Sequence, residues 1–309
     1  MGFASRGSIT TGHFEMSLDG NRTTAYLKSV DGGWAKHALV DESIGGENAR
    51  IKHASVAEID PISFEFGMSG SNSILQWIQA SWRKQWQRKS GEITHADFNY
   101  RATFHHQFSD ALLTETTFPT LDGASKEAAY VKVKFQPESV VTQKGKGESI
   151  IPMGGTKQKM WLCSGFRLNI DGIDDAKYVN KIDAFTVKQG VKKMYIGAER
   201  FPQIEPTKLE FPNLTCTIST QYGDALHDWY QQYVHKGARA ATGEKKSGSL
   251  EFLSPDRGRT LFRINLYDIG LLSLNIPQMT ANSDQIKRFK FEMSIGSMDL
   301  DGPDKLGLE

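Results

Sequence analysis

The residues of this sequence with the most potential for chemistry are its 8 histidines and 2 cysteines. His105 and His106 are adjacent, and neighbours in a strand point to opposite faces, so the pair cannot share one metal ion. Cys163 and Cys216 have no CxxC partner, which favours reduced thiols and synthesis in a reducing compartment. No Ser, His and Asp spacing stands out, although a triad is defined by geometry and not by chain order. We therefore predict no catalytic, cofactor or metal site, and a protein that is not an enzyme.

Three further groups of residues could bind a ligand. The glycine- and lysine-rich segment at 145–155 lacks the GxxxxGK[ST] pattern and the strand–helix context of a phosphate loop. Trp77, Trp82 and Trp86 could stack on a ligand, but tryptophans in a helical stripe are more often core residues. The basic run WRKQWQRK (82–89) could contact nucleic acid, but we interpret it as a solvated face. The formal net charge of +1 gives no global field that would attract nucleic acid or an acidic partner.

The elements that must position these residues occur twice. NSILQWIQASW, which starts at Asn72, returns as DALHDWYQQYV at Asp224, and HFEMSLDG (13–20) faces GFRLNIDG (165–172) at the same offset of 152 residues. A register kept without a gap from the first strand to the helix indicates tandem duplication of one domain. The predicted organisation is a first domain at 1–143, a linker at 144–160 and a second domain at 161–309.

The repeated stretch has the pattern of a helix packed against a core. Large apolar residues fall at i, i+3, i+4 and i+8, which places them on one stripe of a helix. We predict helices from 72 to about 89 and from 224 to about 236, with Asn72 and Asp224 as N-caps. The stripe expected in the core consists of Ile74, Trp77, Ile78 and Trp82 in the first helix, and of Leu226, Trp229, Tyr230 and Tyr233 in the second.

The rest of each half has the pattern of strands. FEMSL (14–18) alternates and ends in an Asp19-Gly20 turn, and separate strands are expected at 97–108 and 111–118. Two polar segments, at 41–58 and 188–210, are too long for tight turns and show little periodicity, so we interpret them as long irregular arms. The residues alone thus predict a duplicated α+β domain that is mainly β.

Several short motifs follow one another in a fixed order. The first half opens with FEMSLDG and LKSVDGG, continues with GGENARIKH (45–53) and ILQWI (74–78), and closes with FPTLDGASKEAAYVKVKFQPES (118–139). The second half closes in a similar way with IPQMTANSDQIKRFKFEMSIG (276–296). In this order the motifs resemble the tail tube protein family of contractile phages and related injection systems.

The resemblance implies a fold and an assembly. Each half is expected to form a tail-tube-like β-barrel or sandwich with one flanking helix, and such domains lie side by side in a ring around a lumen. The arms then reach a neighbouring subunit and cover sheet edges that would otherwise be exposed. The arm residues expected at these inter-subunit contacts are Ser43, Gly45, Gly46, Glu47, Asn48, Arg50 and Lys52, and Lys192, Lys193, Tyr195 and Arg200.

The function implied by the resemblance is structural. The chain is expected to be a ring of a contractile tail or injection particle (tube, tube-initiating baseplate ring or terminal adaptor) that lines a central channel. Expected partners are further copies of the chain, adjacent tube or baseplate rings, and a sheath, spike or cap protein; nucleic acid or cargo enters only as a passenger in the lumen. The alternative is a duplicated β-barrel that binds a ligand, for example a carbohydrate on the Trp-rich surface.

Location and stoichiometry follow from the same resemblance. We expect synthesis in a bacterial cytoplasm and incorporation into a phage tail or phage-like injection particle, without a membrane-bound stage, because no stretch reaches the length of a membrane span. Two domains per chain allow either three chains in one pseudo-six-fold ring or six chains in two stacked rings. Fusion is useful where a six-fold tube meets a three-fold element, so we expect a homotrimer forming a pseudo-hexameric ring, with a homohexamer as the alternative.

Overall fold

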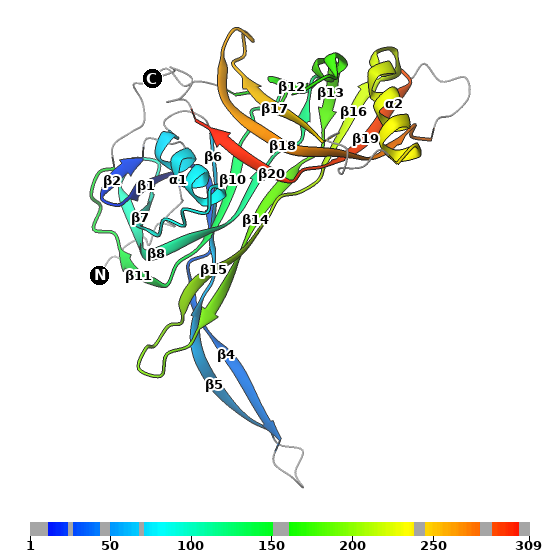
Figure 1. The fold of residues 1–309 in the computed structure, drawn as a ribbon. Coiled ribbons are helices and arrows are strands. Elements are labelled where there is room, and N and C mark those ends of the chain that lie inside the picture. The colour runs from blue at the N-terminus through cyan, green and yellow to red at the C-terminus, as the bar shows by residue number, and fades with distance from the viewer. Residues whose placement is uncertain are drawn as a thin grey trace.

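A computed structural model describes residues 12–23, 27–43, 50–67, 71–150, 161–237, 245–278 and 286–302. Two β-rich lobes lie next to each other, each with one helix on its outside, and a long two-stranded arm projects away from the first (Figure 1). Among the described residues, no helix is long and apolar enough to cross a membrane.

The first lobe, called the first half (12–150) below, is built almost entirely of strands. Its elements in chain order are β1 (His13–Leu18), β2 (Asn21–Thr23), β3 (Leu27–Asp31), β4 (Ala35–Ser43), β5 (Arg50–Ile59), β6 (Ile62–Phe66), α1 (Asn72–Trp82), β7 (Lys89–Ala96), β8 (Ala102–Phe118), β9 (Leu121–Asp122), β10 (Val131–Gln136) and β11 (Ser139–Lys144).

The second lobe, called the second half (161–302), follows the same order. Short 3₁₀ turns at Asp174–Tyr178 and Thr220–Tyr222 and a π-helical turn at Gln231–His235 are added to it. Its other elements are β12 (Phe166–Ile170), β13 (Val179–Ile182), β14 (Phe185–Met194), β15 (Gln203–Glu210), β16 (Leu214–Ser219), α2 (Asp224–Tyr230), β17 (Lys246–Leu253), β18 (Thr260–Asn275), β19 (Arg288–Ser294) and β20 (Ser297–Asp301).

Strand pairing is the same in both halves. The order β1-β7-β8-β10-β6-β3, with β11 also on β8, is repeated as β12-β17-β18-β19-β16-β13, with β20 also on β18. Each sheet bends around buried residues, among them Met16, Phe64 and Phe108 in the first half and Phe252 and Phe291 in the second. The predicted fold class, mainly β in two tandem barrel- or sandwich-like domains with one flanking helix each, is confirmed.

The bend in each sheet comes from one long strand. β8 pairs with β7 and β11 along its first part and with β10 along its second part, so it passes from one layer to the other. The two separate strands predicted at 97–108 and 111–118 are therefore wrong: they belong to one strand, and Asp110 at φ 50° bends it without ending it. Asp268 at φ 54° occupies the same place in β18.

This left-handed geometry gives a direct prediction. A branched side chain at φ near +50° is strained by about 1–2 kcal/mol, whereas glycine adopts this conformation freely. Asp110→Val should therefore lower the free energy of unfolding by about that amount, and Asp110→Gly should change it by less than about 0.5 kcal/mol. Denaturant unfolding of both variants tests this, and equal losses for Gly and Val would contradict it.

Both helices differ in detail from the prediction. α1 ends at Trp82 instead of near residue 89, because Lys84 takes a left-handed φ of 59° and donates its N–H back to the Ser81 carbonyl. The N-cap positions are Ser71 and Gly223, one residue before the predicted Asn72 and Asp224. The second helix is close to its predicted length once the π-helical turn is included.

The two predicted irregular arms are β-hairpins. β4 pairs with β5, and β14 pairs with β15, with the same register and a shift at the same place in both. The alternation that marks a strand in sequence is missing from the first arm because every residue of β4 is exposed, so neither face needs apolar side chains. The Asp19-Gly20 hairpin turn is confirmed, with both residues at positive φ.

Candidate functional site

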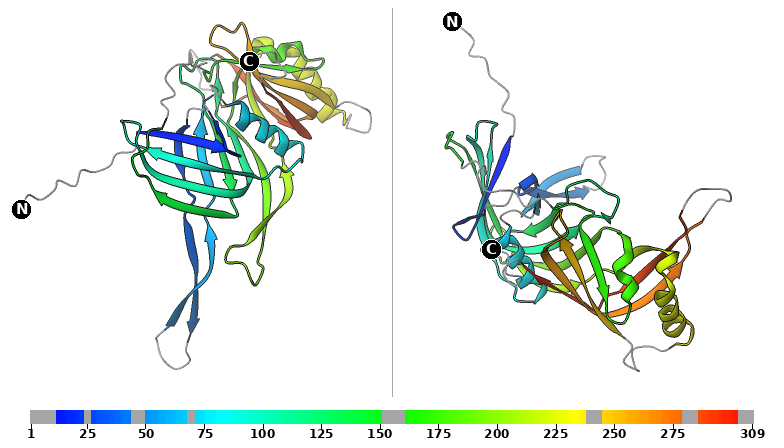
Figure 2. Two further views of the ribbon diagram at one scale, coloured as in Figure 1. Left: turned by 90° about the vertical axis from the view of Figure 1, so that its left-hand side faces the viewer. Right: turned by 90° about the horizontal axis from the view of Figure 1, so that it is seen from above.

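The two halves are joined by a shared sheet. β14, the first strand of the second arm, pairs with the end of β8 in the first half, with Phe185 opposite Phe118 and Lys188 opposite Glu115. The Thr186 and Thr117 hydroxyl oxygens of the same ladder are 2.9 Å apart. We call this contact the internal seam; Figure 2 shows β14–β15 beside the first half in two further views.

The internal seam has an aromatic centre. Phe118 belongs to the first half but is fully buried, stacked on Phe185 at a ring distance of 5.0 Å and on Phe252 at 5.6 Å, both from the second half. Trp161 packs edge-on against Phe252 and Phe262. Each half thus completes part of the other's core. Burying aromatic rings is among the largest sources of packing energy, so this contact should hold the two halves together.

A second contact of the internal seam involves α1. Arg83 binds both carboxylate oxygens of Asp299 in β20, at 2.8 and 2.6 Å, and Gln79 donates to the Leu300 carbonyl. Arg88 donates to Glu138 at 2.5 Å and to the Ile204 carbonyl of β15 at 2.5 Å. The interpretation of the basic run 82–89 as a solvated face is therefore wrong for these two arginines, which bind groups across the seam.

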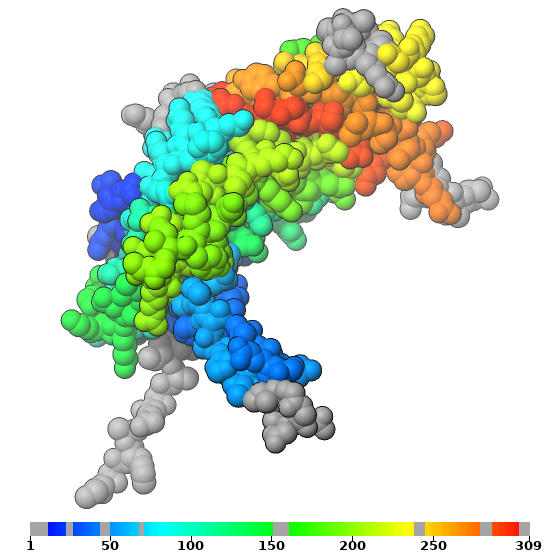
Figure 3. Space-filling view, turned by 60° about the horizontal axis from the view of Figure 1, so that its bottom comes forward, coloured from blue at the N-terminus to red at the C-terminus, as the bar shows by residue number. Residues whose placement is uncertain are grey.

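The predicted residues of the second arm lie at its far end. Lys193 and Tyr195 both hydrogen bond to Glu58 of β5, at 2.9 and 2.5 Å, and the hydrogen bonds from Tyr195 and then Lys193 lower the pKa of Glu58. Lys192 and Arg200 lie on the same hairpin. The second arm thus contacts the first arm at Glu58 (Figure 3, where β14–β15 are green).

The first arm meets the second arm through Glu58, near the end of β5 that enters the body. β4 and β5 pair only with each other among the described residues, and Figure 3 shows this hairpin, in blue, extending away from the body. Large apolar side chains lie exposed along it: Leu39, Val40, Ile51 and Val56. Ser43, Arg50 and Lys52 lie toward its tip, while the predicted Gly45, Gly46, Glu47 and Asn48 fall outside the described residues.

The predicted helix stripes lie against the core. Ile74, Trp77, Ile78 and Trp82 are buried, as are Leu226 and Trp229, and Tyr230 and Tyr233 are partly buried against the same cluster. Trp86 lies beyond the end of α1 and is largely exposed, with its indole N–H on the Gln189 side chain at 3.3 Å.

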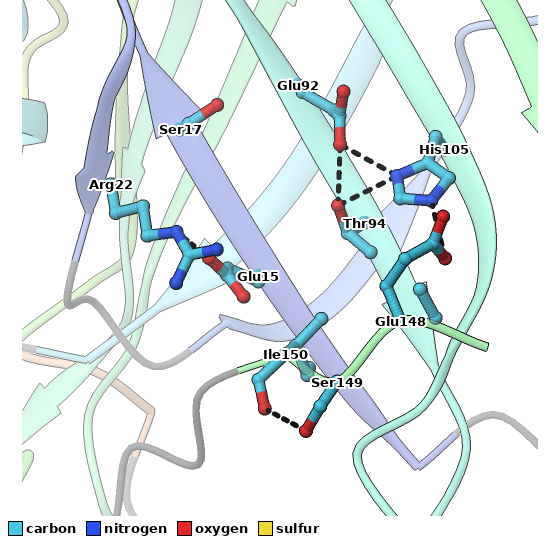
Figure 4. A pocket seen from close by; sticks show the side chains of 10 residues that line it. Glu15, Ser17, Arg22, Glu92, Thr94, His105, Glu148, Ser149 and Ile150 are labelled. Carbon is cyan, nitrogen blue, oxygen red and sulfur yellow. Dashed lines mark hydrogen bonds and ion pairs between the residues drawn. The ribbon is translucent and has the colours of Figure 1, made fainter. Parts of the chain in front are cut away.

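His105 and His106 point to opposite faces of β8. His105 lines a polar hollow of about 190 Å³ between β1, β7 and β8, where its Nδ1 is 2.7 Å from the Glu92 carboxylate and its Nε2 is 3.7 Å from that of Glu148 (Figure 4). Burial raises the pKa of Glu92, but hydrogen bonds from Gln107, His105 and Thr94 outweigh it and lower the pKa overall. The described residues hold no cluster of three or more candidate metal ligands, here or elsewhere.

His106 faces the interior, near the base of the first arm (β4–β5). It lies with His95, Phe104 and Trp34 in one aromatic cluster, 4.8 Å from the Phe104 and Trp34 rings. Its Nδ1 and the His95 Nε2 are buried and have no hydrogen-bond partner among the described residues. Burial, followed by the charge of His95, lowers the pKa of His106 from 6.5 to about 4.

The lowered pKa makes stability depend on pH. Between about 6.5 and 4 the unfolded chain binds a proton at this histidine and the folded chain does not, so the free energy of unfolding should fall as the pH falls through that window. The second half has Ile264 at the equivalent position. His106→Ile should flatten the pH dependence of the unfolding midpoint, whereas His53→Gln on the exposed arm should not; an unchanged profile in the first variant would contradict the assignment.

The motif order, the strand order and the projecting arm can now be compared with known proteins. Residues 10–141 match the family model described as "T4-like virus tail tube protein gp19". Over these residues, which make up less than half of the chain, the sequence is similar to the tail tube family. The match covers nearly all of the first half, including the first arm and α1. No curated protein matches the chain.

Solved structures of low identity are similar to about half of the chain. The sheath–tube complex of an extracellular contractile injection system in its extended state is 19% identical over 45% of this chain and 94% of that chain, with a TM-score of 0.40. The tube-terminating cap of the anti-feeding prophage is 21% identical over 47% of this chain and 96% of that chain, with a TM-score of 0.41. Hcp1 from Flavobacterium johnsoniae is 15% identical over 44% and 94%, with a TM-score of 0.27.

Sequence reasoning missed the residues at the centre of the internal seam. Phe118 and Phe185 have the pattern of ordinary strand ends. A position-by-position comparison of the two copies would have found them, because Phe185 faces Gly33 and Phe118 faces Ile276 at the repeat offsets. Large differences at equivalent places in a duplicated domain mark surfaces that the two copies use differently.

Proposed function

We propose that this chain is a structural ring component of a contractile phage tail or contractile injection system, in which it lines a central channel. The observation that carries the proposal is a first half that matches the tail tube family model and is joined through a continuous sheet to a second half with the same strand order. Tube, baseplate ring and terminal adaptor remain the roles considered. The chain would be made in a bacterial cytoplasm and become part of the particle.

The proposed partners follow from the surfaces left free. Further copies of the chain, adjacent tube or baseplate rings, and a sheath, spike or cap protein would cover the exposed first arm, whose residues Ser43, Arg50 and Lys52 we propose as contacts. Nucleic acid or cargo would pass only through the lumen. The alternative of a carbohydrate-binding module loses two of its three predicted tryptophans, since Trp77 and Trp82 are buried and Trp86 is exposed.

The preferred stoichiometry is a homotrimer that forms one pseudo-hexameric ring. Support comes from the internal seam, which already places two similar domains side by side in one sheet. The test is the mass of the assembled protein, combined with negative-stain electron microscopy. Three chains of 34.5 kDa give about 104 kDa and six give about 207 kDa. A stable monomer without rings would overturn the proposed function, and the larger mass would overturn the trimer alone.

A further inference from the structure

The two surfaces that form the internal seam each have a counterpart in the other half of the chain: the end of β18 corresponds to that of β8, and the start of β4 to that of β14. Within the described residues, these counterparts do not pair with each other in the single chain. We propose that the end of β18 in one copy pairs with the start of β4 in a second copy, and that Ile276 is seated there beside Trp34 of that copy. We call this contact the external seam. It rests on the proposed ring function and names the surfaces that would close the ring.

The backbone edges of the external seam are both present. In the internal seam, Lys188 of β14 lies opposite Glu115 of β8. The two arms share one register, and β8 and β18 share one bend, so the equivalent pair is Lys36 of β4 opposite Ser273 of β18. β18 has β19 on one side of Ser273, and among the described residues no strand lies on the other side. An unpaired edge of this kind is a template for strand addition.

The apolar residues Ile276 and Trp34 of the external seam are exposed in the single chain. Phe118 is 0% exposed in the internal seam, whereas Ile276 at the equivalent position is 44% exposed. Trp34, next to the start of β4, is 53% exposed although it contacts Phe104 and His106. Phe104 is half-buried, whereas Phe262 at the equivalent position is fully buried. Exposed apolar side chains on two such matching surfaces indicate an interaction site.

The sizes of the side chains also complement each other. The internal seam stacks two phenyl rings, Phe118 and Phe185. The external seam has Ile276 for Phe118 and Gly33 for Phe185, and Gly33 has φ +81° with Ile62 atoms only 3.0 Å from where a Cβ would lie. The indole of the following residue, Trp34, therefore supplies the aromatic surface that Gly33 cannot.

The contact between a helix and a strand that supports the internal seam has a weaker counterpart in the external seam. Gln79 of α1 and Arg83, the residue after this helix, bind Leu300 and Asp299 in β20. Their counterparts are Gln231 and His235 on the second helix and Thr142 and Val141 in β11, where Val141 is exposed. Since Val141 cannot form the ion pair that Asp299 makes, we expect the contact between chains to be weaker than the contact within one chain.

A further copy of this chain offers both surfaces in the required register. The β18 end and the β4 start are different surfaces of one molecule, so the contact is head to tail, and head-to-tail contacts generate closed rings when the rotation between units closes. Both halves of the chain have the same strand order, so copies of this chain alone would complete the ring.

A cysteine cross-link tests the external seam directly. Lys36→Cys and Ser273→Cys in one chain should give disulfide-linked chains on a non-reducing gel of the assembled protein, because the two residues face each other only between copies. Thr117→Cys with Thr186→Cys is the positive control, which should link within one chain. Lys36→Cys with Tyr267→Cys is the mismatched control, which should not link. The native Cys163 and Cys216 are buried, and burial raises the pKa of both thiols, so they should not interfere.

A variant of Ile276 tests the external seam independently of the cross-link. Ile276→Glu should convert rings to single chains in sedimentation, since it places a carboxylate against an aromatic surface, while far-UV circular dichroism stays unchanged. The matched control is Phe98→Glu, which alters a side chain that is 65% exposed and whose counterpart, Pro255, is also exposed. Normal rings in Ile276→Glu, or rings without the Lys36–Ser273 cross-link, would overturn the external seam but leave the ring function standing. The absence of rings in the unaltered protein would overturn both.

Discussion

A chain that lacks residues 43–54 is expected to fold normally but to lose its ability to join particles. The deletion removes the distal part of the first arm, where residues 43 and 50–54 are all exposed, Ile51 among them, and β4 and β5 pair with each other. Removing it costs the body of the protein no buried surface, whereas a neighbour in the particle would lose its main contact. Negative-stain microscopy and sedimentation measure assembly, and circular dichroism measures folding.

The matched control for this deletion is the other arm. Removing residues 197–200 shortens the tip of β14–β15, whose described contacts, such as Lys193 and Tyr195 with Glu58, lie within the chain. That variant should still assemble. If particles form normally without residues 43–54, or if both deletions abolish assembly equally, the first arm does not have the role proposed for it.

Trp77→Ala is expected to lower the free energy of unfolding by roughly 3–5 kcal/mol, the usual range for truncating a buried tryptophan. The indole is buried against Phe135 at a ring distance of 5.6 Å, and its N–H donates to the Gln87 carbonyl at 2.9 Å. Trp229→Ala should cost somewhat less, because the Trp229 indole N–H has no partner among the described residues and no hydrogen bond is lost.

Denaturant unfolding followed by tryptophan-independent circular dichroism measures both losses. Trp86→Ala is the internal control, since this side chain lies beyond the end of α1 and is 40% exposed; its loss should stay below about 1 kcal/mol. A similarly small loss for Trp77 would mean that the indole does not support the core and is available for another role.

The parts of the fold that could be predicted are those with local periodic signals. The helix stripe around Trp77 and the Asp19-Gly20 turn are encoded within a few residues of each other, so their geometry follows from spacing. The shared offset between Trp77 and Trp229 was equally visible, because duplication leaves its register in the chain. These features depend on neighbours in sequence, which a single sequence displays.

The parts that could not be predicted depend on distant partners. β4 has no inward face, so its residues carry none of the alternation by which a strand is recognised. Asp110 resembles a turn residue, yet its left-handed conformation only redirects a strand that continues beyond it. Phe118 and Phe185 meet across 67 positions, and nothing near either residue indicates the other. Arg83 likewise meets Asp299 only after the second half has folded onto the first.

The covalent link between the halves changes how a ring of this chain would grow. In a ring of three chains, every second domain–domain contact is an internal seam and forms by intramolecular closure, at an effective concentration set by the connecting segment instead of by the number of molecules in the cell. Only the remaining contacts are bimolecular. Formation of the ring would then depend less steeply on protein concentration than formation of the same ring from six separate domains. Such a chain could close its ring while still scarce, before more abundant one-domain subunits begin to associate.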